Sequence, residues 1–192
     1  MKLIISDLDF TLINGNVEKE FLIFNMLRPN DLNILPYVSF LLHFIVKKLF
    51  KTLGISFPFK LFYIHYDKPS FTNNLKRWIR SVKINDIEIN ETLSNKIRSS
   101  TQSIILTSCP FYIAKPFVKH VLGLPKTYVI GTDLSEFNNR LFIVKSKMYG
   151  KKKADFVSST IKSRNIQAQG YGDSEADKFF LELCNYHEKV QF

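Results

Sequence analysis

Cysteine and long apolar stretches are both scarce in this sequence of 192 residues. The only two cysteines, Cys109 and Cys184, lack the spacing of metal ligands, which argues against a disulfide framework and against a zinc site. This usage of cysteine predicts a reducing compartment, the cytoplasm. The very apolar run at residues 37–46 is shorter than the roughly 20 residues that cross a bilayer. The first residues are one lysine, three apolar residues and then acids, which is not the pattern of a secretory signal.

Acidic residues are in the minority, because 17 Asp and Glu stand against 27 Lys and Arg, giving a formal net charge of +10. Such a surface favours anionic partners: phosphorylated small molecules, acidic lipid headgroups or nucleic acid. No nucleic-acid-binding module and no alternation of basic with aromatic residues is present, so nucleic-acid binding is not expected. With 45% hydrophobic residues the chain can bury the core of one ordinary domain, or a core with a modest insertion.

The first half of the chain has a helical pattern after one short strand. An apolar strand at residues 3–5 is followed by a turn at residues 14–16, and the pattern then predicts helices over 17–27, 34–50, 71–84 and 90–99. The apolar helix at 34–50 is expected to lie buried in a cap. Its lysine-rich end and the Phe-rich stretch at 57–66 leave an interfacial membrane anchor as the alternative.

Strands and helices alternate from residue 102 onward. The pattern predicts strands at 103–106, 128–130, 166–171 and 188–192, helices at 110–122, 150–162 and 174–184, and a hairpin over 134–144 that turns at residues 138–139. Together with the first strand, this order predicts an α/β fold with a doubly wound parallel sheet. Ligands of such sheets bind at the carboxyl ends of the strands.

Asp7 and Asp9 follow the first strand directly. Two carboxylates this close repel each other unless a proton or a cation lies between them. One interpretation is a turn in which both side chains cap backbone groups. The other is a nucleophilic carboxylate and a proton-transferring carboxylate beside a divalent metal.

Thr107 and Ser108 occupy the equivalent place after the second strand, at the predicted start of a helix. They would cap that helix, or form a phosphate-binding cradle together with its free amides. After the late strand, Asp173 precedes a predicted helix start, and Asp177 lies one turn further on, where it fits either a capping box or a site. Of the three lysines at 151–153, two are expected on the surface, and one could point inward to balance the acids.

Together these residues are expected to form one site of four acids, a hydroxyl and a lysine. Asp7, Asp173 and the carbonyl of Asp9 could hold Mg²⁺, which prefers oxygen ligands. Asp7 would then form an aspartyl-phosphate, while Asp9 would protonate the leaving alcohol and activate water.

The same elements, in this order, resemble the haloacid dehalogenase (HAD) superfamily of phosphohydrolases, in its phosphoserine-phosphatase-like subgroup. Residues 7–11 (Asp-Leu-Asp-Phe-Thr) resemble its first motif, 104–107 its second, Lys153 its third and 172–177 its fourth. The match covers a Rossmann-like core at 1–13 and 100–192, and residues 14–99 stand where the family inserts a helical cap. The resemblance implies Asp7 as nucleophile, Asp9 as general acid and base, and Thr107 with Lys153 on the phosphate, with Ser108 as the alternative hydroxyl. It implies Mg²⁺ held by Asp7, Asp9 and Asp173, with Asp177 in support.

One departure bears on the substrate. Phosphoserine phosphatases have a glutamate for the substrate amine where this chain has Asn16. Asn16 is therefore predicted to influence substrate choice, and the expected substrate is a phosphomonoester other than phosphoserine. A phosphotransferase of the same superfamily is the nearest alternative. The alternative outside enzymes is a binding protein for anionic ligands or membrane surfaces, with peripheral membrane contact through the cap.

Overall fold

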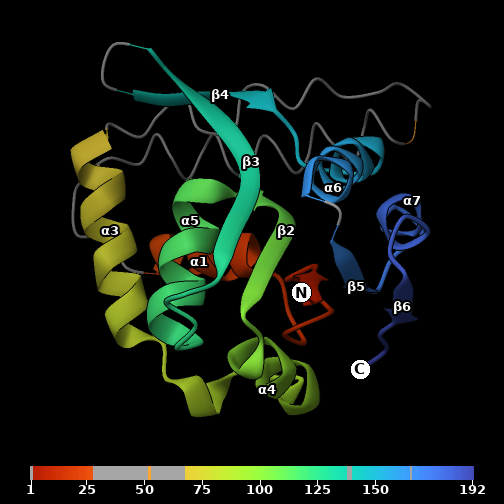
Figure 1. The fold of residues 1–192 in the computed structure, drawn as a ribbon. Coiled ribbons are helices and arrows are strands. Elements are labelled where there is room, and N and C mark those ends of the chain that lie inside the picture. The colour runs from red at the N-terminus through yellow and green to blue at the C-terminus, as the bar shows by residue number, and fades with distance from the viewer. Residues whose placement is uncertain (1, 28–51, 53–67, 138–139, 165) are drawn as a thin grey trace.

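The computed structural model describes residues 2–27, 52, 68–137, 140–164 and 166–192 (Figure 1). The predicted helix at 34–50 and the Phe-rich stretch at 57–66 lie outside these residues. The membrane-anchor alternative, which depends on them, therefore stays a prediction. Within the described part of the chain, no helix is both long and apolar enough to span a bilayer.

The fold is built on a six-stranded sheet in the order β4-β3-β2-β1-β5-β6. All neighbouring strands pair in parallel except β3 and β4, which are antiparallel. The doubly wound parallel sheet predicted from the sequence is confirmed, with an antiparallel strand at one edge. The strands are β1 (Lys2–Ser6), β2 (Gln102–Pro110), β3 (Tyr128–Phe137), β4 (Arg140–Ser146), β5 (Gln167–Gly172) and β6 (Tyr186–Lys189).

Helices cover both faces of this sheet. In β1, Ile4 belongs to one hydrophobic cluster and Leu3 with Ile5 to another, because successive side chains of a strand point to opposite faces. Figure 1 shows α6 and α7 on one side of the sheet and α1, α3 and α5 on the other. The helical elements are α1 (Val17–Leu27), α3 (Lys68–Ser81), η2 (Ile84–Asp86), α4 (Glu91–Ser99), α5 (Phe111–Pro116), η3 (Phe117–Val121), α6 (Lys151–Arg164) and α7 (Lys178–Leu181).

The described helices from residues 17–99 share their core with the sheet. Phe21 of α1, Trp78 of α3 and Leu93 of α4 are buried in the same cluster as Ile4 and Ile105. The proposed division into a core of 1–13 and 100–192 and a cap of 14–99 stays a prediction.

The helix predicted over 71–84 lies three residues earlier, as α3. Two other predicted helices are split or shortened in the structure. The helix expected over 110–122 is split into α5 and a π-helical segment, η3, at Pro116, which has no N–H to donate within a helix. The helix expected over 174–184 is reduced to α7, because Ser174 and Asp177 form a turn ahead of it, with the Asp177 N–H donating to the Ser174 carbonyl at 3.0 Å. By contrast, α1 has the predicted bounds, and α4 begins after Asn90, whose side chain accepts the Leu93 N–H.

The predicted hairpin at 134–144 is confirmed as β3 and β4, with its turn at 138–139 outside the described residues. The strand predicted at 128–130 runs on without a break into that hairpin, so β3 pairs with β2 at its start and with β4 at its end.

Gly131 of β3 lies so close to the end of β2 and the start of α5 that a side chain has no room. A Cβ at this position would be 2.5 Å from the Cys109 carbonyl oxygen and 2.9 Å from the Phe111 nitrogen, and both are backbone atoms. We expect Gly131→Ala to lower the free energy of unfolding by about 1–3 kcal/mol, as overpacking does. The measurement is urea unfolding. Gly15→Ala is the matched control, because a Cβ there meets nothing within 4 Å, and equal effects of the two changes would contradict this explanation.

Candidate active site

The carboxyl ends of three adjacent strands bring the predicted site residues together. In the sheet β1 lies between β2 and β5, so the chain ends that leave these strands meet at one edge. The residues concerned are Asp7 and Asp9 after β1, Thr107 in β2, Lys153 in α6, Asp173 after β5 and Asp177 just before α7.

Lys153 ties two of the acids to each other. Its side chain is only 3% exposed, and its Nζ lies 2.8 Å from Asp7 Oδ1 and 2.6 Å from Asp177 Oδ1. The neighbouring Lys151 and Lys152 are exposed, and Lys152 donates to the hydroxyl of Ser146. One lysine of the three therefore points inward, as the sequence suggested. The buried lysine compensates part of the negative charge, which is the usual requirement for burying ionised groups.

Asp7 is the acid most strongly affected by burial. Burial raises the pKa of Asp7 to about 7, although the contact with Lys153 acts in the opposite direction, and the nearby Asp177 adds to the rise. Removal from water disfavours the charged form of a carboxyl group. The ionised form of Asp7 is thus less favoured here than in water, in spite of the contact with Lys153.

Asp9 lies in a different environment. Its Oδ1 accepts the N–H of Val17 at 2.8 Å, and its Oδ2 lies 3.5 Å from the hydroxyl of Thr107. Burial raises the pKa of Asp9 to about 6, while the bond from Val17 lowers it. The two carboxyls therefore have distinct surroundings, which is the condition under which paired acids take different roles.

Thr107 does not cap the following helix. The N-cap of α5 is Pro110, and the Thr107 hydroxyl instead accepts the N–H of Cys109 at 3.0 Å. Ser108 is held through its backbone, because its carbonyl accepts a 2.6 Å bond from the hydroxyl of Thr132. The interpretation of Thr107 as a plain helix cap is wrong, and its hydroxyl faces Asp9.

Asp7, Asp173 and Asp177 form an acidic group in which one carboxylate oxygen of each residue lies within 4.8 Å of one from each of the others. Asp9 is not part of this group. Asp177 accepts bonds from Lys153, from the Ser174 N–H at 3.2 Å and from the Ser174 hydroxyl at 2.6 Å, so its oxygens are already engaged by the protein. Burial raises the pKa of Asp173, with Asp177 adding to the rise. Carboxylate oxygens with uncompensated charge are a donor set that fits a hard divalent cation such as Mg²⁺.

Two hydroxyl groups that support the site were missed in the sequence. Thr11 donates to Asp173 Oδ1 at 3.2 Å, and Thr132 links Ser108 to the segment before α6 by accepting the Met148 N–H at 3.2 Å. Ser174 holds Asp177 through its N–H and its hydroxyl, the pairing that the capping-box pattern had indicated. Thr11 belongs to the 7–11 motif, so its position was available from the sequence. Thr132 had no local pattern, because its partners come from two other segments.

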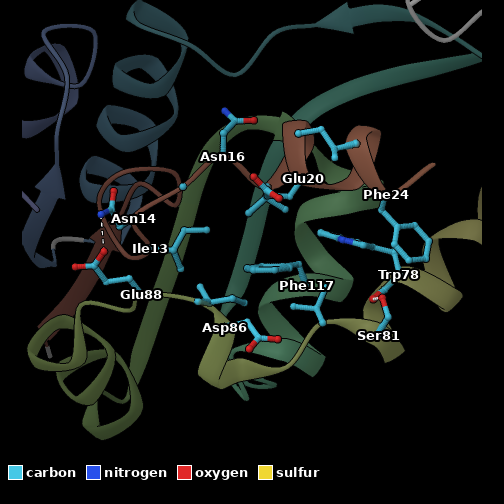
Figure 2. Close-up of a pocket in the computed structure, with 15 residues that line it drawn as sticks. Ile13, Asn14, Asn16, Glu20, Phe24, Trp78, Ser81, Asp86, Glu88 and Phe117 are labelled. Carbon is cyan, nitrogen blue, oxygen red and sulfur yellow. Dashed lines mark hydrogen bonds between the residues drawn. The ribbon is translucent and has the colours of Figure 1, made fainter. Parts of the chain in front are cut away.

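Asn16 acts as the N-cap of α1. Its side-chain oxygen accepts the N–H of Lys19 at 2.8 Å, which is a structural duty common for asparagine. Asn16 also lines a pocket beside α1 (Figure 2). Its influence on substrate choice stays a prediction.

The raised pKa values predict how stability depends on pH. The ordinary pKa of 3.8 applies to both carboxyls in the unfolded chain, against about 7 for Asp7 and about 6 for Asp9 in the folded protein. Folding therefore takes up protons, and the stability contributed by these groups is lost as pH rises from about 4 to about 7. Thermal unfolding without divalent metal is the measurement. The double change Asp7→Asn and Asp9→Asn should flatten this dependence, and an unchanged slope would contradict the assignment.

Comparisons with known proteins identify a matching family model and several solved structures with a similar fold. A family model described as haloacid dehalogenase-like hydrolase matches residues 4–182, which confirms the resemblance predicted from the motifs. A protein of unknown function from Bordetella pertussis has a similar structure, with a TM-score of 0.72 at 13% identity over 97% of this chain and 88% of that one. A HAD family hydrolase from Salmonella enterica has a TM-score of 0.58 at 15% identity, over 95% and 60%. A probable phosphoserine phosphatase from Vibrio cholerae has a TM-score of 0.59 at 12% identity, over 97% and 55%. No curated protein sequence matches the chain significantly.

Proposed function

Since this chain belongs to the haloacid dehalogenase-like hydrolase family, we propose that it is a phosphatase that hydrolyses a phosphomonoester with the help of Mg²⁺. The observation that carries the proposal is the pairing of Asp7 with Lys153 next to Asp173 and Asp177, while Asp9 faces Thr107. This arrangement supports different roles for two residues of one short loop, Asp7 as the nucleophile and Asp9 as the general acid and base.

Mg²⁺ would be held by Asp7, Asp173 and the carbonyl of Asp9, with Asp177 in support. When bound, it supplies positive charge that offsets the repulsion between Asp7 and the phosphate. Asp177 is better suited to orient Lys153 than to bind metal directly, because Lys153 and Ser174 already occupy its oxygens.

In the first half of the proposed reaction, a carboxylate oxygen of Asp7 attacks phosphorus and the bond from phosphorus to the leaving oxygen breaks. Asp9 gives its proton to that oxygen, so an alcohol leaves and an aspartyl-phosphate remains. In the second half, Asp9 takes a proton from water as the water oxygen attacks phosphorus. The bond to Asp7 breaks and inorganic phosphate leaves. The Thr107 hydroxyl, with Ser108 as the alternative, and the Lys153 ammonium would bind phosphate oxygens throughout.

A pKa of about 6 supports the role given to Asp9. A general acid works best when its pKa lies near the working pH, because both protonation states are then accessible. The substrate proposed is a small phosphomonoester other than phosphoserine, since Asn16 replaces the amine-binding glutamate that the subgroup has there. A cytoplasmic location and contact of the cap with membranes remain proposals from the sequence.

Removal of metal tests the proposal most directly. We expect the protein to hydrolyse an aryl phosphate in the presence of Mg²⁺ and to lose at least about 10²-fold in rate after chelation, because the charge on Asp7 and the phosphate is no longer offset. Addition of Mg²⁺ should restore the rate, and addition of Ca²⁺, which favours a larger and looser ligand shell, should not. Full activity in excess chelator would refute the metal dependence. An added acceptor alcohol that receives the phosphate would indicate a phosphotransferase in place of a hydrolase.

A further inference from the structure

A pocket of about 450 Å³ lies beside α1, and neither the acidic group of Asp7, Asp173 and Asp177 nor Lys153 lines it. Figure 2 shows it between the loop after β1, α1, the end of α3 and the segment that follows it, with Phe117 of η3 among the side chains that line it. Such a volume is sufficient for a small organic molecule. The described residues that line it are Ile13, Asn14, Gly15, Asn16, Val17, Glu20, Ile23, Phe24, Trp78, Ser81, Val82, Asp86, Ile87, Glu88 and Phe117.

The charge of the pocket is opposite to that of the protein. Among the described residues that line it, Glu20, Asp86 and Glu88 are charged and none is a lysine or arginine, although the chain has 27 basic against 17 acidic residues. Over the described part of the chain, no basic side chain forms an ion pair with any of the three. Glu88 accepts a 2.6 Å hydrogen bond from the side chain of Asn14. The pocket therefore favours a positively charged occupant.

The remaining walls are apolar and aromatic. Trp78 and Phe117 stack with ring centroids 5.6 Å apart and an angle of 17° between the planes. Phe24 and the isoleucines at 13, 23 and 87 extend this surface. Aromatic faces attract cations, and they do so most effectively for organic ammonium groups that shed water easily.

A bare metal ion fits this pocket poorly. Among the described residues, the acids close enough to hold an ion together are Asp7, Asp173 and Asp177, and none of the pocket acids is among them. Carboxylates from α1 and from the segment after α3, beside an apolar surface, match a larger cation. We propose that the pocket binds an organic ammonium group, an amine or a quaternary ammonium, on a small apolar body.

The pocket shares part of its wall with Asp9. Val17 lines the pocket and donates its N–H to Asp9 Oδ1 at 2.8 Å, and Ile13 lines it and forms an isolated β-bridge with Asp9. An ammonium group in the pocket could thus belong to the alcohol part of the substrate, an assignment that rests on the proposed function, or to a separate effector. The chemistry is the same for both sources.

Trp78 makes binding directly measurable. It is the only tryptophan of the chain and it lines the pocket, so tryptophan fluorescence, excited at a wavelength that tyrosine does not absorb, reports on this site. We expect choline to change the fluorescence saturably. The neutral carbon isostere of choline should bind at least about tenfold more weakly, with sodium chloride added to match the ionic strength. Equal binding of the two probes, or no saturable change with choline, would overturn the proposal.

The acids are tested one at a time. Glu20→Gln, Asp86→Asn and Glu88→Gln should each weaken choline binding about three- to tenfold, because each removes one attractive charge at partly solvated distance. Glu182→Gln removes an exposed acid that is not among the residues lining the pocket and should leave binding unchanged. Binding unaffected by all three pocket changes would also overturn the proposal.

Two phosphate esters distinguish an ammonium group of the substrate from that of a separate effector. If the ammonium belongs to the substrate, choline phosphate should have a kcat/KM at least about tenfold above that of its neutral isostere, and Glu20→Gln should reduce this preference. If it belongs to an effector, the two esters should react equally while free choline still binds. Choline binding without any phosphatase activity would leave the pocket assigned and refute the proposed function instead.

Discussion

Asp7→Asn should lower kcat/KM for an aryl phosphate by at least about 10³-fold at saturating Mg²⁺. The amide has nearly the same shape as the carboxyl and can still accept the hydrogen bond from Lys153, but it is not an anionic nucleophile and cannot form the aspartyl-phosphate. Losses of this size are usual when a covalent nucleophile is removed. Asp155→Asn, an exposed change two residues beyond Lys153 on α6, is the control and should keep full activity.

The same variant should be more stable than the original protein above pH 7 in the absence of metal. Burial raises the pKa of Asp7 to about 7, so the folded protein above that pH contains an ionised carboxyl that would be better solvated in the unfolded chain. The amide removes this cost. A rise in Tm together with the loss of activity would be a trade of stability for function. An active Asp7→Asn protein would refute any mechanism in which Asp7 attacks phosphorus.

Lys153→Met should cost roughly 3–5 kcal/mol of unfolding free energy, as removal of one member of a buried charge cluster does. Lys153 is 3% exposed and is bonded to both Asp7 and Asp177, so a neutral side chain leaves these carboxyls without their cation. Activity should fall with it, because the phosphate loses a positive partner. Urea unfolding and aryl phosphate hydrolysis are the two measurements.

The cause of that loss can be separated from a general packing defect. The difference in stability should shrink as pH falls toward 4, because protonation of the unpaired carboxyls removes the need for a cation. Mg²⁺ should restore part of the stability without restoring the rate. Lys152→Met, one residue earlier and exposed, should leave both the unfolding free energy and the rate of hydrolysis unchanged. If the loss of stability in Lys153→Met did not depend on pH, its cause would be packing alone.

Much of the site was predictable from the sequence because strand ends bring residues together in a simple way. Asp7 and Asp9 follow an apolar strand, and in a parallel sheet the polar residues after neighbouring strands share one edge. The same reasoning placed Thr107 and Asp173. It could not select Lys153 from three consecutive lysines by pattern alone, since only the rotation of α6 decides which of them faces Asp7.

The parts that were not predicted depend on contacts between distant segments. The bonds of Thr132 to Ser108 and Met148 exist only because β3 passes both segments. The early end of α5 follows from Pro116, whose effect on a helix was visible, but the π-helical continuation was not. The turn before α7 forms because Asp177 binds Ser174 and Lys153 together, and a local helical pattern contains no information about Lys153.

The central position of β1 also has a consequence for how the protein folds. This strand comes first in the chain, yet its partners β2 and β5 begin at residues 102 and 167. Contacts that span so much of the chain are slow to form, and the apolar residues of β1 stay without partners until then. A growing chain would therefore emerge from the ribosome with Asp7 and Asp9 already made, but without the other residues of the proposed active site. The site would be completed only when the last quarter of the protein docks.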